Sequence, residues 1–285
     1  MQADHIDCYV AKDEVRIRFY QWGKGDPDVL FIHGLGDGAY VWNVVIGALH
    51  GNSCVAAVDL RGHGDSDWSA NGKYSIDTFL ADVEGVLESR FRLGATIVGH
   101  SLGGDIAIRL AVRRPDLVRK IAILDFSPEP DPRVLNRVRD DLRMRDRKYR
   151  TRDEYASILL TQRPFLTAQE AARLSKHALD GCVEQGFTLK SDPSLSEYRR
   201  QKADAPSQEE MWTLIKSVRC ENIILRGVSS SVLSAPIARR MSELLGNSRY
   251  TPISNCGHGL VTENPFAVAA ALEEFQLSNW PMEAA

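Results

Sequence analysis

Short apolar runs alternate with segments of helical periodicity through the first 126 residues. Val29–His33 and Val55–Asp59 are almost wholly apolar and only five residues long, so each is predicted to be a strand buried on both faces of a sheet. The other predicted strands of this part are Tyr9–Val10, Val15–Tyr20, Ala95–Val98 and Ile121–Asp125, and the predicted helices are Tyr40–Leu49, Thr78–Glu88 and Leu102–Arg113. Alternation of this kind predicts an α/β fold, a mostly parallel twisted sheet with helices on both faces.

After Phe126 the alternation stops. Prolines follow at positions 128, 130 and 132, and a helical block then runs to about Val218. Three capping boxes mark helix starts within it: Thr151…Glu154, Thr167…Glu170 and Ser207…Glu210, with a candidate short strand at Gly186–Lys190. Strand and helix patterns return in Ile223–Arg226, Pro236–Leu245, Arg249–Ile253 and Pro265–Leu277. We therefore expect a sheet domain built from residues 1–126 and 219–285, interrupted by a helical cap at 127–218.

Composition narrows the class of protein. A chain of 285 residues can hold one large α/β domain with an insertion. Its net charge of −3 and pI near 6.2 give no reason to expect a nucleic-acid partner. Met1–Asp7 is polar and lacks the apolar core of a signal peptide, and no apolar run reaches the ~18 residues of a membrane span. The five cysteines are scattered, as expected for reduced thiols in a cytoplasmic protein.

The segment Ala95–Gly104 carries the clearest chemical signal. A β-branched run ends in Gly-His-Ser-Leu-Gly, and a helical pattern follows at once. A strand, sharp turn and helix in this order expose a single serine hydroxyl, here that of Ser101. The turn strains the backbone of the serine and brings strand and helix together, so a Cβ at position 99, 103 or 104 would collide with the neighbouring element. Glycine occupies all three positions.

Four motifs occur in the order and spacing of the α/β-hydrolase superfamily, which the chain therefore resembles. They are Phe31-Ile-His-Gly-Leu-Gly36, Asp59-Leu-Arg-Gly-His-Gly-Asp-Ser66, Gly99-His-Ser-Leu-Gly103 and Gly257-His258-Gly259. The resemblance covers nearly the whole chain outside the predicted cap. It implies that the Asp59–Ser66 segment is a structural turn, so that His63 is not a catalytic residue.

The resemblance also implies roles at the site. Ser101 corresponds to the nucleophile and His258 to the base that takes its proton, since a serine hydroxyl is a poor nucleophile unaided. The backbone amides of Leu35 and Leu102 correspond to the oxyanion hole. No cofactor is expected, and the sequence has none of the spaced histidine clusters that bind metals.

The acid of the triad is where this chain departs from the family. Relatives usually carry an aspartate shortly after the strand that follows the cap, and Ser231 stands at that position here. Three explanations remain open. Asp125, at the end of an earlier strand, supplies the carboxylate; a Ser101–His258 dyad works with help from Ser231 or water; or the site binds ligands without turnover. Losing the carboxylate lowers turnover by roughly 10⁴ in well-studied triads.

These observations predict a serine hydrolase that cleaves a carboxylic ester, thioester or lactone in a small-molecule acyl substrate. The alternatives are an acyltransferase or cyclase, a lyase or oxygenase on the same fold, and a ligand-binding receptor. Asp131–Glu154 holds nine basic and six acidic side chains. This segment is either a solvated helix face or an entrance for an acyl group carried by coenzyme A or a carrier protein. The sequence does not predict an oligomeric state.

Overall fold

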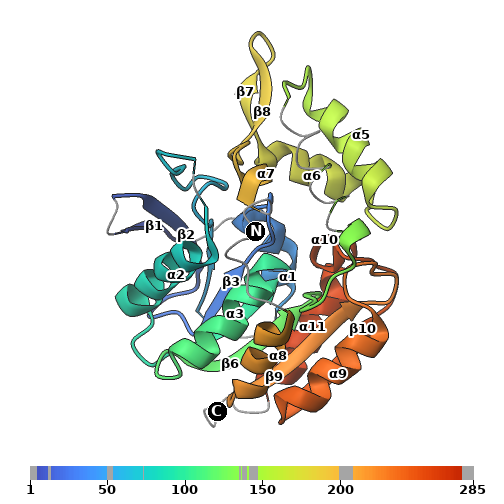
Figure 1. The fold of residues 1–285 in the computed structure, drawn as a ribbon. Coiled ribbons are helices and arrows are strands. Elements are labelled where there is room, and N and C mark those ends of the chain that lie inside the picture. Colours follow the sequence, from blue (N-terminus) through green and yellow to red (C-terminus); the bar gives the residue numbers. More distant parts are fainter. Residues whose placement is uncertain are drawn as a thin grey trace, which may run out of the picture.

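The apolar runs form one eight-stranded sheet at the centre of the protein (Figure 1). The computed structural model describes residues 5–11, 14–49, 54–72, 74–134, 136, 140, 147–198 and 208–277. The strands are β1 (His5–Val10), β2 (Arg16–Trp22), β3 (Val29–Ile32), β4 (Val55–Val58), β5 (Ala95–His100), β6 (Val118–Leu124), β9 (Glu221–Gly227) and β10 (Ser248–Ile253). Their order is β1-β2-β4-β3-β5-β6-β9-β10. Only the β1–β2 and β2–β4 pairings are antiparallel, which confirms the predicted fold class.

Helices cover both faces of the sheet because successive strand residues point to opposite sides. Leu30 and Ile32 of β3 pack with α2 (Ile76–Arg90), α3 (Leu102–Arg113), α8 (Gln208–Ser217) and α9 (Ala235–Leu245). Val29 and Phe31 pack on the other face with η1 (Ala39–Trp42), α1 (Asn43–Ala48), α10 (Leu260–Glu263) and α11 (Pro265–Leu277). The segment expected to be one helix, Tyr40–Leu49, is thus a 3₁₀ turn followed by a short α-helix.

The insertion between β6 and β9 lies above one end of the sheet in Figure 1. It contains α5 (Arg152–Gln162), α6 (Ala168–Ala178), the hairpin β7 (Leu179–Cys182) and β8 (Gly186–Leu189), and α7 (Leu195–Tyr198). Thr151 and Thr167 cap α5 and α6 by accepting hydrogen bonds from the amides of Glu154 and Glu170, as their capping boxes predict. The third predicted cap, Ser207, lies outside the described residues, as do ten of the 24 residues of the charged segment 131–154.

The last helix of the expected cap segment has a different environment from the rest. α8 contacts α3 and α9, and Met211, Trp212 and Ile215 are buried in the same cluster as the helices of the sheet domain. Apolar side chains at helical spacing therefore anchor α8 on the sheet domain rather than on α5 and α6. The boundaries of the two units stay a prediction.

Candidate active site

Ser101 sits in a strained turn between β5 and α3. Its backbone angles are φ 53° and ψ −111°, a conformation that L-residues rarely adopt. Glycines permit the turn: a Cβ on Gly99 would lie 2.1 Å from the carbonyl oxygen of Gly103, and one on Gly103 would lie 2.3 Å from that of Ile32. The expected strand, turn and helix are therefore present, and the packing at these glycines leaves no room for a side chain.

The turn that contains Leu35 lies beside the serine. A Cβ on Gly34 would lie 3.3 Å from Ser101 Cβ, so the Gly34–Gly36 turn and the serine are in close contact. Leu102 is the first residue of α3, and the first amides of a helix have no acceptor within the helix. Both predicted oxyanion donors thus belong to segments adjoining Ser101, and their catalytic role remains a prediction.

Two buried histidines hold the Gly34–Gly36 turn. His33 Nδ1 donates to Gly34 O at 2.7 Å, and its Nε2 accepts from Leu60 N at 3.0 Å. His63 Nδ1 donates to Arg61 O at 2.9 Å, while its Nε2 accepts from Gly36 N at 3.0 Å. Burial lowers the pKa of His33 below its ordinary value and that of His63 to about 3. Both imidazoles are therefore neutral acceptors for backbone amides, and His63 has the structural role that the sequence predicts.

Asp125 and His258 lie in direct contact. Asp125 Oδ2 is 2.8 Å from His258 Nδ1, and the carboxylate is completely buried. Asp125 directly follows β6, in a left-handed conformation with φ 50°, and its amide donates to Leu225 O of the neighbouring strand at 2.8 Å. A buried carboxylate that accepts from Nδ1 fixes the tautomer of the imidazole and leaves Nε2 able to accept a proton. Of the three explanations of the acid, the geometry favours the first.

The serine that contacts this carboxylate is Ser230, not Ser231. Ser230 Oγ donates to Asp125 Oδ2 at 2.5 Å and accepts from the amides of Val232 and Leu233. Gly227 N also donates to Asp125 Oδ1, at 3.2 Å. Ser231 is exposed. Sequence reasoning missed Ser230 because the motif alignment fixes which residue replaces the family aspartate but not which hydroxyl turns inward.

A second histidine, His100, joins the turn of Ser101 to the loop of His258. His100 Nε2 donates to the backbone oxygen of His258 at 2.8 Å, and the two rings lie 4.8 Å apart, centre to centre. Burial and the nearby His258 lower the pKa of His100 to about 4. Among the described contacts there is no hydrogen bond between Ser101 Oγ and His258 Nε2; such bonds are often long in free enzymes and shorten when substrate binds. The motif Gly-His-Ser was the available signal for His100.

Arg163, which follows the last residue of α5, extends from the insertion to two loops of the site, the Gly34–Gly36 turn and the loop of His258. Arg163 Nη2 lies 3.4 Å from Asp37 Oδ1, next to the Gly34–Gly36 turn, and Nη1 lies 3.3 Å from Thr262 Oγ1 in α10. Its Cδ is 3.6 Å from where a Cβ on Gly259 would lie, so it packs against the loop of His258. Nothing in the sequence identified this residue, because the contact joins segments about a hundred residues apart.

The remaining candidates have structural roles. Cys256 is fully buried and its thiol donates to Ile253 O; burial raises the pKa of the thiol to about 12, which disfavours thiolate chemistry. Asp105 pairs with Arg109 along α3 at 2.6 Å. No group of three metal-ligating side chains is found in the described ranges. Every helix within those ranges is too short or too polar to cross a bilayer.

Comparison with known proteins agrees with this architecture. A sequence model of the alpha/beta hydrolase family matches residues 29–271. The chain belongs to this family. It is 25% identical over 275 residues to 2-(acetamidomethylene)succinate hydrolase of Mesorhizobium japonicum, with 96% of each chain covered. A crystal structure of E-2-(acetamidomethylene)succinate hydrolase superposes with a TM-score of 0.84 at 22% identity, covering 95% of this chain and 99% of that one.

A shorter but closer similarity exists to esterase Rv0045c of Mycobacterium tuberculosis. Identity is 41% over 108 residues, which are 38% of this chain and 36% of the esterase. The match therefore spans about a third of that relative. Relatives named esterase and hydrolase support a hydrolase activity for this α/β-hydrolase chain.

Proposed function

We propose that this chain is a serine hydrolase that cleaves a carboxylic ester, thioester or lactone through an acyl-enzyme on Ser101. The observation that carries the proposal is the 2.8 Å contact between the buried Asp125 carboxylate and His258 Nδ1, next to a serine in a strained turn. A receptor would need neither the strained turn nor a buried acid oriented on an imidazole. The substrate is expected to be a small acyl compound.

In the proposed reaction, His258 Nε2 takes the hydroxyl proton as Ser101 Oγ attacks the substrate carbonyl carbon. The tetrahedral oxyanion accepts hydrogen bonds from the amides of Leu35 and Leu102, each worth roughly 10²–10³ in rate. His258 returns the proton to the departing alcohol or thiol, and Asp125 stabilises the imidazolium between the two transfers. Water, deprotonated by the same imidazole, then releases the acid from the acyl-enzyme.

The test combines covalent labelling with turnover. Wild type and Ser101→Ala are treated with a fluorophosphonate probe and assayed on p-nitrophenyl esters, an acyl thioester and a lactone, with Ser89→Ala on α2 as the matched control. We expect labelling and turnover in wild type and in Ser89→Ala. In Ser101→Ala we expect no label and a turnover rate that is lower by a factor of at least about 10⁴.

The other outcomes separate the alternatives. Labelling of Ser101 without turnover of any acyl substrate would contradict the hydrolase proposal and favour a receptor. Turnover that survives Ser101→Ala would mean that no acyl-enzyme forms on this serine, as in a lyase or oxygenase that uses His258 as a plain base.

A further inference from the structure

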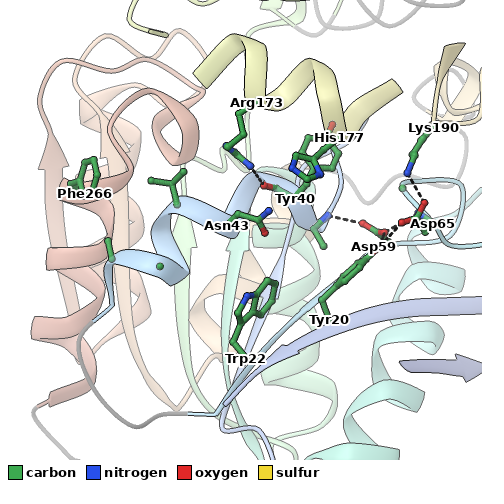
Figure 2. A pocket seen from close by; sticks show the side chains of 15 residues that line it. Tyr20, Trp22, Tyr40, Asn43, Asp59, Asp65, Arg173, His177, Lys190 and Phe266 are labelled. Atoms are coloured by element: carbon green, nitrogen blue, oxygen red, sulfur yellow. Dashed lines mark hydrogen bonds and ion pairs between the residues drawn. The ribbon is translucent and has the colours of Figure 1, made fainter. Parts of the chain in front are cut away.

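A pocket of about 700 Å³ lies between the sheet domain and the insertion, apart from the nucleophile (Figure 2). The end of β2 and the helices η1 and α1 form its sheet-domain side, and α6 lies across it. Ser101, Leu35, Leu102, Asp125 and His258 do not line it. The volume is that of a typical small-molecule site.

The two cations that line this pocket, Arg173 and Lys190, have N–H groups left over from their contacts with the protein. Arg173 uses three of its five N–H groups, on the Glu170 carboxylate and on Tyr40 O, which leaves two. His177, one helical turn after Arg173 on the same face of α6, stacks on Tyr40.

The carboxylates that line the pocket are already supplied with donors from the protein. Asp59 accepts from Ala39 N at 2.6 Å and Asp65 N at 2.8 Å, and its Oδ2 lies 3.1 Å from Tyr20 Oη. Asp65 accepts from Tyr20 Oη at 2.6 Å and from Lys190 Nζ at 2.7 Å. Both carboxylates are therefore hydrogen-bonded to donors of the protein itself, whereas Lys190 keeps two of its three N–H groups unused. A ligand that supplies hydrogen-bond acceptors would therefore complement this pocket.

The electrostatic environment under α6 agrees with this count. Burial, followed by the positive charges of Arg173, Lys176 and Lys190, holds the pKa of His177 below its ordinary value. Arg173 is paired with Glu170 and Lys190 with Asp65, so these cations act on a ligand mainly through the N–H groups that their partners leave over. The pocket walls nearby are aromatic, since Tyr20, Trp22 and Tyr40 contribute rings (Figure 2). Donors of this kind beside aromatic rings suit an anion with an apolar body.

We infer that this pocket binds an organic carboxylate with an apolar body, its carboxylate at Arg173 and His177 and its body against the aromatic wall. The site is separate from Ser101 and goes beyond the proposed hydrolase activity, so its occupancy does not depend on turnover.

The test measures binding of 1-naphthoate to the full chain by isothermal titration calorimetry at 0.15 M salt, with 1-naphthamide as the uncharged counterpart. We expect one saturable site for naphthoate and at least tenfold weaker binding of the amide. Arg173→Met should weaken naphthoate binding about tenfold or more. His177→Phe keeps the ring on Tyr40 but removes the donor, and should weaken binding about 3- to 10-fold. Lys176→Met, an equal loss of charge outside the pocket, should change it less than twofold.

Three results would overturn the inference. The first is the absence of saturable naphthoate binding at millimolar concentration. The second is equal affinity in wild type and His177→Phe, a variant that keeps the ring packing even where Arg173→Met proves unstable. The third is loss of binding after fluorophosphonate modification of Ser101, which would place the probe in the catalytic site. Calorimetry needs no turnover, so failure of the hydrolase proposal would leave the first two readouts intact.

Discussion

Asp125→Asn puts an amide where three donors converge. The carboxylate accepts from His258 Nδ1 and Ser230 Oγ on one oxygen and from Gly227 N on the other. If the amide oxygen faces His258, the NH₂ group meets the Gly227 amide, donor against donor. If it faces Gly227, the NH₂ group donates to His258 Nδ1 but also meets Ser230 Oγ, which already accepts from the amides of Val232 and Leu233. This second orientation moves the imidazole proton to Nε2, where the base must be free.

The expected loss follows from the wrong tautomer and the missing charge. Turnover should fall about 10⁴-fold, a barrier increase of about 5.4 kcal/mol, with a much smaller change in KM. The fold should survive, because asparagine tolerates the left-handed backbone at this position. The assay is steady-state ester hydrolysis, with Asp105→Asn as the control: its carboxylate pairs with Arg109 on α3 and should change turnover only a few-fold. A folded Asp125→Asn enzyme that keeps more than a tenth of wild-type turnover would refute the assignment of the acid.

Three further predictions concern the surroundings of the site. Ser230→Ala removes a donor to the carboxylate and should lower turnover about 3- to 10-fold, whereas Ser231→Ala should leave it unchanged; equal rates in the two variants would contradict the geometry. Gly103→Ala should lower the free energy of unfolding in urea by about 1–3 kcal/mol, because its Cβ would meet the backbone of β3; unchanged stability would show that the turn can relax. Burial keeps His63 and His100 neutral in the fold, with pKa values of about 3 and about 4, whereas the unfolded chain protonates them near pH 6.5. The unfolded state then binds more protons as pH falls from 6.5 towards 4, so each histidine should lower the free energy of unfolding by up to about 1.4 kcal/mol per pH unit, and His63→Asn should flatten this slope in urea titrations at pH 7 and 5.

The sheet and the nucleophile turn were predictable because local patterns determine them. A run such as Val29–His33 is too short and too apolar for a surface helix, and Gly99 serves a close approach to Gly103 within five residues of chain. Even the last helix, Pro265–Leu277, begins where its apolar pattern indicates. The one helix expected at Tyr40–Leu49 divides into η1 and α1 at Asn43, a change of hydrogen-bond register that periodicity does not reveal.

Contacts between distant segments were not predictable. Ser230 and Arg163 reach the site from loops whose side-chain directions depend on backbone angles, and no periodic pattern encodes these angles. The pocket under α6 depends on how the insertion lies over β2 and α1, so the partners of Arg173 could not be inferred from its place in a helical pattern. Sequence identifies the chemistry of such residues, but only the packed structure shows which of them meet.

The position of the acid illustrates this difference. β6 and β9 are neighbouring parallel strands, so their carboxyl ends lie side by side and a carboxylate after either strand can reach the same imidazole. In this chain Asp125 follows β6, and the end of β9 and the loop after it supply donors to Asp125, through Gly227 N and Ser230 Oγ. Placing an acid in the loop after β9 by Ser231→Asp should therefore raise turnover little while Asp125 is present, because His258 Nδ1 already donates to one carboxylate. In an Asp125→Asn background the same change should restore turnover only if the new side chain turns inward, as that of Ser230 does. A large gain from Ser231→Asp alone, measured on the same ester, would mean that Asp125 does not act as the acid.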